Sequence, residues 1–294
     1  MHRSLLLLLL SGSLVAAVSE AQRKAIDEGT GGKGAYTDAE DVYRVNFPRT
    51  DVSVAVDGRA LHPFLGLTSW AAFTPHSATE LMVMGDLVVF EDEVNAVISA
   101  ALDNGLEVTA LHNHFFFDSP RVMFMHIGGS GSAEKLASGV GKALAAVKQV
   151  RAGNARPASA FSGAAIPAES TISAAPIDTI LNVKGQTNSG MYKASIGRKA
   201  TMHGKTVSNQ MGVNTWAAFA GSDAAATVDG DFAMLEGELQ GVLKALRKGG
   251  INIVAIHNHM TNEEPQFVFL HYWGKGRASD LAKTLRAALD TQGR

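Results

Sequence analysis

The tetrapeptide Leu-His-Asn-His occupies residues 111–114 and is followed, after eleven further residues, by His126. Ile-His-Asn-His at residues 256–259 is followed at the same spacing by His271. Six of the ten histidines of the chain therefore lie in two matching segments: His112, His114, His126, His257, His259 and His271. A match of this kind within one chain indicates an internal duplication, and we expect each copy to bring its histidines together in the same way.

Similarity between the two halves of the chain extends beyond the histidines. Trp-Ala-Ala-Phe at residues 70–73 returns at 216–219, and Gly-Asp at 85–86 returns at 230–231, with an offset of 145 (230 − 85) from there onward. We therefore predict two similar subdomains packed about an approximate twofold axis. The predicted division is a signal peptide at 1–21, repeat unit 1 at 22–150, a linker rich in Ala, Ser, Gly and Pro at 151–176, and repeat unit 2 at 177–294.

Each unit shows the same succession of hydrophobic periodicities. In the first unit, residues 81–90 are typical of a strand, and apolar residues at spacings of three and four within 94–102 predict an amphipathic helix. A strand over 106–114, a second strand ending at His126, and a helix carrying apolar residues through 136–144 follow. The order strand-helix-strand-strand-helix predicts an α+β fold built from two ferredoxin-like units, each with extra N-terminal strands.

Composition excludes several classes of partner and site. Only 18% of the 294 residues are charged and the net charge is −2, so we expect no nucleic acid partner. The absence of cysteine excludes disulfides, thiolate metal sites and a cysteine nucleophile. Any metal must therefore be held by histidine, carboxylate, amide or backbone groups.

The N-terminal segment is typical of a secretory signal peptide. Basic Arg3 precedes an apolar run at residues 5–10, and small residues suited to cleavage lie within 17–21. The apolar run is too short to cross a membrane, so we expect no membrane span in the mature form. The sequence thus predicts a periplasmic or secreted protein, and polar, Gly-rich residues 22–42 are expected to be poorly ordered.

The histidine spacing predicts a shared patch on a β-hairpin. If the turn is centred on Ser119, His112 faces His126, and centring the second copy on Glu264 sets His257 opposite His271. Directly opposed residues share one face of a sheet. In a regular strand that face would also carry Leu106, Val108 and Ala110, with Ile251, Ile253 and Ala255 in the second copy, so the histidines would extend an apolar face.

Three imidazoles on one patch in each copy indicate a metal site. The pattern is similar in geometry to carbonic anhydrase, where His-x-His on one strand and a third histidine on its neighbour hold zinc. Imidazole ligands favour zinc here, and copper, iron, nickel or manganese also fit. The alternative is that the histidines are structural and only pack or form hydrogen bonds.

Two matching carboxylates are weaker catalytic candidates. Glu93 and Glu238 fall in the first turn of equivalent helices, where the helix dipole by itself accounts for an acidic residue. A general-base role would require the helix start to lie near the histidines. Asp86 and Asp231 also match, and we interpret them as turn or bulge residues.

The same segments resemble the LppY/LpqO family of uncharacterised bacterial envelope and secreted proteins. The resemblance includes residues 111–114, 119–121 with 125–127, 211–216, 256–259 and 270–274, and extends over nearly the whole mature chain. It implies export and supplies no activity. Some members of that family are lipoproteins, and a chain without cysteine is not expected to carry a lipid anchor.

Together these patterns predict an exported protein in which one or both histidine triads bind a divalent transition metal. A three-histidine site with an open position would activate water, which favours a metal-dependent hydrolase. The alternative is a non-catalytic envelope protein that binds a small molecule or sequesters metal. The sequence leaves the substrate and the oligomeric state open.

Overall fold

The computed structural model describes residues 17–293. Most of the predicted signal peptide, residues 1–16, lies outside the described residues. Within the described part of the chain, no helix combines the length and apolar character needed to cross a membrane.

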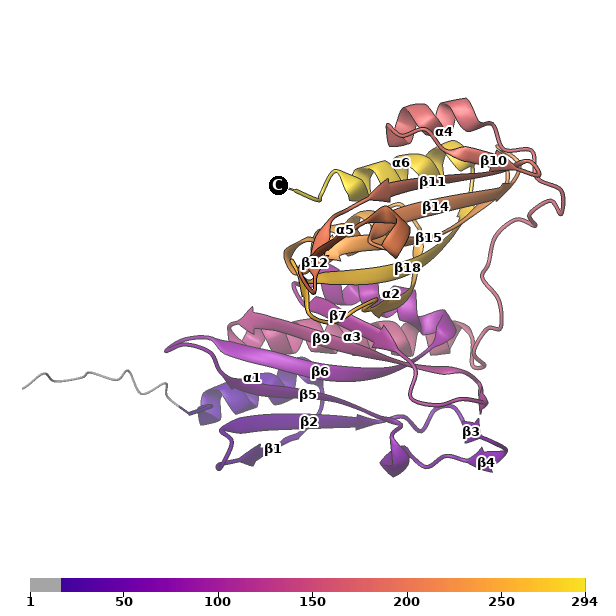
Figure 1. Ribbon diagram of the computed structural model, residues 1–294. Helices are drawn as coiled ribbons and strands as arrows, with labels where there is room; N and C mark the ends of the chain where they lie inside the picture. Colours follow the sequence, from indigo (N-terminus) through magenta and orange to yellow (C-terminus); the bar gives the residue numbers. More distant parts are fainter. Residues whose placement is uncertain (1–16, 294) are drawn as a thin grey trace, which may run out of the picture.

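The two halves of the chain form the same α-helices and strands in the same order (Figure 1), and η denotes a short 3-10 helix. The first half comprises α1 (Glu20–Thr30), β1 (Gly34–Thr37), β2 (Val42–Pro48), β3 (Ala55–Val56), β4 (Arg59–Ala60), η1 (Pro63–Leu65), β5 (Thr68–Pro75), β6 (Leu81–Phe90), α2 (Glu91–Asp103), β7 (Glu107–His112), β8 (Asp118–Ser119), β9 (Val122–Gly131) and α3 (Ala133–Gly153). The second comprises α4 (Ala174–Leu181), β10 (Gln186–Asn188), β11 (Met191–Gly197), β12 (Ala200–Met202), β13 (Lys205–Val207), η2 (Asn209–Met211), β14 (Asn214–Gly221), β15 (Ala226–Leu235), η3 (Glu236–Glu238), α5 (Leu239–Lys248), β16 (Asn252–His257), β17 (Glu263–Glu264), β18 (Phe267–Gly276) and α6 (Ala278–Leu289).

One antiparallel sheet of twelve strands runs through both halves in the order β1-β2-β5-β6-β9-β7-β16-β18-β15-β14-β11-β10. The order is palindromic with respect to the repeat, and the halves meet where β7 pairs with β16 at Leu111 and Ile256. Within each half the strand-helix-strand-strand-helix unit has the predicted order. The α+β class and the internal duplication are therefore confirmed.

All six helices cover one face of the sheet in the described chain (Figure 1). The apolar residues at helical spacing in α2, including Val97 and Ile98, are buried there beside the inward residues of β6, β7 and β9. The buried cluster continues across the repeat junction through Leu111 and Ile256. A single core therefore joins the two halves.

The opposite face is covered only in part, by two three-stranded sheets. Strands β4-β3-β8 lie over the ends of β6 and β9 in the first half and enclose a small core that includes Phe90 and Phe124. Strands β13-β12-β17 do the same in the second half, over a core that includes Phe267 and Phe269. The central strands keep an open stretch between these two covers, and the histidines lie there.

The expectation that residues 22–42 are poorly ordered is wrong. Helix α1 occupies much of that segment, with Ile26 fully buried and a capping box between Ser19 and Gln22 at its start. Val18, just before the cap, is also buried, and its N–H donates to Asp41 Oδ1 at 3.0 Å. The polar surface of the segment concealed an amphipathic helix that packs against α3.

Two side-chain amides bind the repeats to each other reciprocally. Asn95 on α2 bonds to both backbone groups of Ile253 on β16, accepting from N at 2.7 Å and donating to O at 3.1 Å. Gln240 on α5, which lies 145 residues later, bonds in the same way to Val108 on β7. It accepts from the Val108 N–H at 3.1 Å and donates to the Val108 carbonyl oxygen at 2.9 Å. Each of these backbone residues borders a β-bulge, so the partner repeat satisfies polar groups that the interrupted ladder leaves open.

Candidate metal centre

The six predicted histidines form two clusters on the open face of the central strands. In repeat 1, the ring centroid of His112 lies 5.1 Å from that of His114 and 5.2 Å from that of His126. The cluster in repeat 2 is similar, with the ring centroid of His257 5.1 Å from that of His259 and 4.7 Å from that of His271. The structure thus brings together the three imidazoles of each copy.

The pairing that brings them together differs from the predicted hairpin. His112 pairs with Phe124, and Ala110 pairs with His126, so the register is slipped by two residues. The slip arises because the chain after His112 leaves the main sheet and forms β8, which pairs with β3 instead of making a tight turn. A slip of two preserves the face of every side chain, which is why the histidines still meet.

Of the predicted apolar neighbours of the histidines, Ala110 and Ala255 lie on the histidine face, whereas the prediction is wrong for Leu106, Val108, Ile251 and Ile253. A β-bulge at Thr109 shifts the alternation, so that Val108 and Leu111 point into the helix-covered core while Ala110 and His112 point to the open face. The same irregularity occurs in β16 between Ile253 and Ala255. A bulge inserts one residue and reverses the faces beyond it, which the hydrophobic pattern alone did not reveal.

The two clusters are neighbours. Leu111 pairs with Ile256 across the junction, and continuing this antiparallel register by one residue sets Ala255 opposite His112. His112 and His257 are then diagonal neighbours, with backbones about 7–8 Å apart. Only the small side chains of Ala110 and Ala255 lie between these histidines, so both clusters lie on the same open surface of the sheet.

Sequence reasoning missed one aspartate in each cluster. Asp86 pairs with His126 on the adjacent strand β6, and Asp231 pairs with His271 on β15. Both are mid-strand and buried, with Asp231 only 2% exposed, so the interpretation as turn residues is wrong. The sequence did hold a signal for them, because an aspartate that recurs at the same position of two predicted strands and is buried there requires a partner for its charge.

In repeat 2, Asp231, His257 and His259 offer ligand atoms that all lie within 4.8 Å of one another. This cluster could hold a metal ion. His259 Nε2 lies 3.0 Å from Asp231 Oδ2, and its Nδ1 lies 3.1 Å from the carbonyl oxygen of Gly212. Asp231 Oδ1 accepts a hydrogen bond from the N–H of Leu270 at 3.1 Å.

These contacts demand a positive charge beside His259. The Gly212 carbonyl can only accept, so Nδ1 must carry a hydrogen, and in a neutral ring Nε2 would then face the Asp231 carboxylate with a lone pair. Either a second proton or a cation must lie at that contact. The observed separation of 3.0 Å is that of a hydrogen bond, and two tetrahedral ligands about 2.1 Å from one metal are about 3.4 Å apart, so a metal requires only a small outward shift of the two groups.

His257 belongs to the group that could hold a metal, whereas His271 lies beside it, stacked on His257, and outside that group. Burial lowers the pKa of His257, against the charge of Asp231 that raises it, so the ring is held in the neutral form that binds metal. Its Nδ1 is buried and has no hydrogen-bond partner among the described residues. His271 Nδ1 contacts the Gly230 carbonyl at 3.2 Å, which leaves Nε2 as its free ring nitrogen.

An aromatic ring supports the outermost histidine of each cluster. His259 stacks on Phe269 with ring centroids 3.5 Å apart and planes 9° from parallel. His114 stacks on Phe124 in the same way, at 3.3 Å and 6°. Both histidines lie beyond the end of their strand, so the stacking orients rings that the backbone ladder no longer positions.

The repeat 1 cluster has the same residues in a looser arrangement. Asp86 Oδ1 is buried without a hydrogen-bond partner among the described residues. Burial lowers the pKa of His114, opposed by the charge of Asp86, and neighbouring His112 and His126 lower it further. Within the described chain, no ion pair between Asp86 and a histidine corresponds to the one that joins Asp231 to His259 in repeat 2, so this cluster is less preorganised.

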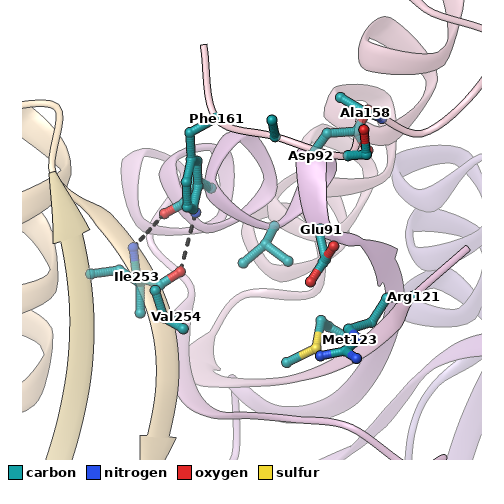
Figure 2. Close-up of a pocket in the computed structure, with 12 residues that line it drawn as sticks. Glu91, Asp92, Arg121, Met123, Ala158, Phe161, Ile253 and Val254 are labelled. Carbon is teal, nitrogen blue, oxygen red and sulfur yellow. Dashed lines mark hydrogen bonds between the residues drawn. The ribbon is translucent and has the colours of Figure 1, made fainter. Parts of the chain in front are cut away.

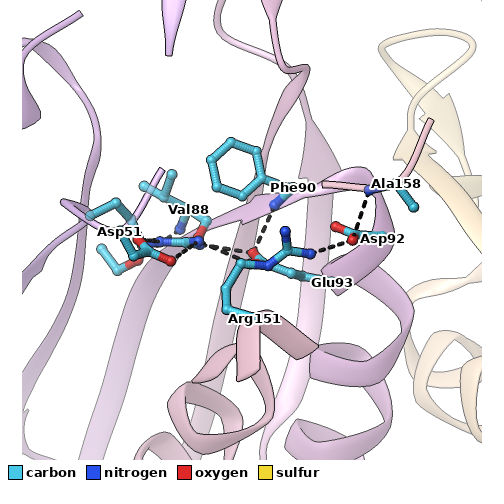
Figure 3. A network of polar contacts seen from close by, with 9 residues as sticks. Asp51, Val88, Phe90, Asp92, Glu93, Arg151 and Ala158 are labelled. Atoms are coloured by element: carbon cyan, nitrogen blue, oxygen red, sulfur yellow. Dashed lines mark hydrogen bonds and ion pairs between the residues drawn. The ribbon is translucent and has the colours of Figure 1, made fainter. Parts of the chain in front are cut away.

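Glu93 is held in a structural ion-pair network (Figure 3). Its carboxylate is fully buried and receives hydrogen bonds from Arg49 at 2.8 and 2.9 Å and from the N–H of Phe90 at 2.9 Å. Arg151 Nε lies 2.8 Å from Oε1 of Glu93.

Glu238 repeats this role in the second half. Arg198 approaches its carboxylate at 2.5 and 3.2 Å, and the N–H of Leu235 donates to it at 2.8 Å. Burial favours the neutral acid, but these bonds outweigh it and lower the pKa of Glu238. Neither Glu93 nor Glu238 makes a hydrogen bond or ion pair with a histidine of the clusters. Each carboxylate instead caps the start of its helix and pairs with arginine.

The residues that recur between the two halves match one domain family twice. A model described as Domain of Unknown Function (DUF1259) covers residues 24–146 and 175–291. The chain belongs to this family. Its double match agrees with the duplication in the fold, and its description does not carry the LppY/LpqO name.

Other comparisons add little. No curated protein matches the chain at a significant level. A solved structure of a trimeric bacterial microcompartment shell protein, PduB, is 10% identical, with 88% of this chain and 89% of that chain covered and a TM-score of 0.20. A TM-score this low supports no conclusion about fold or assembly.

Proposed function

We propose that this DUF1259 protein binds a divalent transition metal through Asp231, His257 and His259, with His271 beside them as a further ligand. The close contact of His259 Nε2 with Asp231 Oδ2 carries the proposal, because it places a carboxylate against a ring nitrogen that a neutral imidazole cannot donate from. A divalent cation at that point satisfies both groups.

The matching residues of repeat 1 are proposed as a second, weaker site. Asp86, His112, His114 and His126 repeat the donor set, and the buried, unpartnered Asp86 Oδ1 supplies the corresponding unsatisfied charge. Its looser geometry requires side chains to move on binding, which reduces affinity because ordering them costs free energy.

The donor set limits the metal and its chemistry. The carboxylate of Asp231 and the imidazoles of His257 and His259, with His271 in one further position and the remaining positions open, suit zinc, iron or manganese, and zinc remains the favoured ion, with copper and nickel as alternatives. A metal held this way can lower the pKa of bound water and so support hydrolysis. A metal-dependent hydrolase is therefore the first candidate activity.

A non-catalytic metal-binding protein is the second candidate. It is favoured by the engagement of Glu93 and Glu238 with arginines, which leaves neither available as a general base. Turnover on panels of esters, phosphate esters and glycosides by the metal-loaded protein would favour the hydrolase. Stoichiometric metal with no turnover on any panel would favour sequestration.

Metal content gives the direct test. Protein produced without a histidine tag and exposed to zinc should retain close to one zinc per chain after dialysis, measured by plasma mass spectrometry. His257→Ala should remove it, whereas His76→Ala, a histidine outside both clusters, should not. A wild-type chain that retains no transition metal would refute the proposal.

We also propose that the protein is exported and that its leader is cut before Val18, which is earlier than the end of the predicted signal peptide at residue 21. The apolar N-terminal sequence supports export, and the burial of Val18 with the capping role of Ser19 supports the position of the cut. Intact mass spectrometry of the protein from the cell envelope or medium tests this. A mature chain beginning after Ser19 would contradict the position, and retention of the full chain in the cytoplasm would contradict export.

A further inference from the structure

A cavity of about 310 Å³ lies where the two repeats and the connecting segment meet (Figure 2). Its walls come from the start of α2, the start of β9, the bulge of β16 and residues 158–161 of the connection. The α2 wall puts the cavity on the helix-covered side of the sheet, away from the open face with the histidine clusters. Its volume is at the lower end of the range for small-molecule sites, which is about 300–1,000 Å³.

Polar contacts hold the walls of this cavity in place, and apolar side chains form much of its lining. Asn95 is committed to the backbone of Ile253 through the two hydrogen bonds described above. Asp92 accepts from the N–H of Ala158 at 3.0 Å and pairs with Arg151, which ties the connecting segment to α2. The cavity is therefore a built feature, and the segment that closes it occurs only once in the duplicated chain.

Large apolar side chains face this space without cover. Phe161 is 46% exposed and Val254 is 42% exposed, and both line the cavity together with Met123. Val254 is the bulge residue of β16, and bulges commonly redirect a side chain toward a site. An exposed valine and phenylalanine around one concave space favour an apolar group as the occupant.

One acid and one base remain available at the same cavity. Glu91 and Arg121 are both exposed, both line it, and neither takes part in an ion pair with any residue in the range 17–293. In Figure 2 both side chains lie on the same side of the cavity. An anion bound at Arg121 would be repelled by Glu91, and a cation at Glu91 would be repelled by Arg121. A group that carries both charges satisfies both.

The internal repeat supplies an independent comparison. The position of Arg121 is taken by Gln266 in repeat 2, and the position of Val254 is taken by Thr109 in repeat 1. At the cavity, the two positions carry arginine and valine. Their equivalents away from the cavity carry glutamine and threonine, which are polar and uncharged. The repeats also differ at many positions away from the cavity, such as Met84 and Asp229, so these two differences supply matched substitutions with which to test the cavity.

We infer that this cavity binds a free zwitterionic amino acid with a large apolar side chain, its carboxylate at Arg121, its ammonium at Glu91 and its side chain against Phe161 and Val254. This site is separate from the proposed metal centre and does not depend on it. Phenylalanine is the simplest molecule with the required features.

Isothermal titration calorimetry of the full chain with three matched probes tests the inference. L-Phenylalanine carries both charges, N-acetyl-L-phenylalanine only the carboxylate, and L-phenylalaninamide only the ammonium. L-Phenylalanine should bind at least about tenfold more tightly than either blocked form. Arg121→Gln and Val254→Thr should each weaken it by about tenfold or more.

Both variants install the residue of the twin position, so the fold should tolerate them, and circular dichroism melts check this. Gln266→Arg and Thr109→Val at the twin positions should leave the affinity unchanged. Absence of binding by L-phenylalanine up to about 10 mM, equal binding of a blocked form, or unchanged affinity in folded Arg121→Gln would each overturn the inference.

Discussion

Replacing Asp231 by asparagine separates the metal site from the fold that contains it. Asparagine keeps an oxygen that can accept from the Leu270 N–H, and its NH₂ group can donate to His259 Nε2 where the carboxylate now lies. In the metal-free protein the substitution exchanges a contact between a carboxylate and a protonated imidazole for a neutral hydrogen bond, so the zinc-dependent part of the stability is the quantity that reports on the metal site. What is lost is the charged ligand.

The size of the effect follows from mass action. Loss of an outer-shell partner typically weakens metal binding by 10–100-fold, so loss of a direct carboxylate ligand should cost about 100-fold or more. Zinc at about 100 times its Kd stabilises the wild-type chain by about 2.7 kcal/mol. At the same zinc concentration, a variant that binds 100-fold more weakly gains only about 0.4 kcal/mol.

Thermal unfolding with and without zinc measures this difference. Asp229→Asn is the matched control, since it removes the same charge from the same strand two residues away. Wild type and Asp229→Asn should show the zinc-dependent rise in Tm, and Asp231→Asn should show little of it. An equal rise in all three proteins, or none in the wild type, would show that Asp231 does not bind the ion.

Three further predictions concern the supporting structure. Glu93→Gln removes the fully buried carboxylate shared by Arg49 and Arg151 and leaves Asp51 as the charged partner of Arg49, so it should lower the free energy of unfolding by about 3–5 kcal/mol in urea titrations, and a loss below about 1 kcal/mol would contradict the role of this carboxylate. Gln240→Ala strands the N–H and C=O of Val108 at the repeat junction and should cost about 1–3 kcal/mol, with unchanged stability as the contrary result. The lowered pKa of Glu238 means that its ion pair stabilises the fold above the unfolded-state pKa and that this contribution disappears as pH falls through the folded-state pKa. The stability difference between wild type and Glu238→Gln should therefore shrink in acid, and a constant difference from about pH 7 to about pH 3 would contradict this.

The order of elements was readable from local patterns because each element buries its own periodic face. Spacings of three and four in α2 follow from one helix face packing on the sheet, and the matching segments revealed the duplication directly. The segment around Ile26 was misjudged because few apolar residues identify α1, and its packing against α3 supplies the stability that its composition does not.

The sequence alone determined that the chain is duplicated, that its class is α+β, and that three histidines in each copy share one face. The last point held despite a wrong register because side chains alternate with period two and the error was also two. Tertiary structure decided which face that is: the bulges at Thr109 and Val254 turn the histidines away from the helix-covered core. It also decided that Asp86 and Asp231, distant in sequence, join them, since only strand pairing brings β6 beside β9 and β15 beside β18.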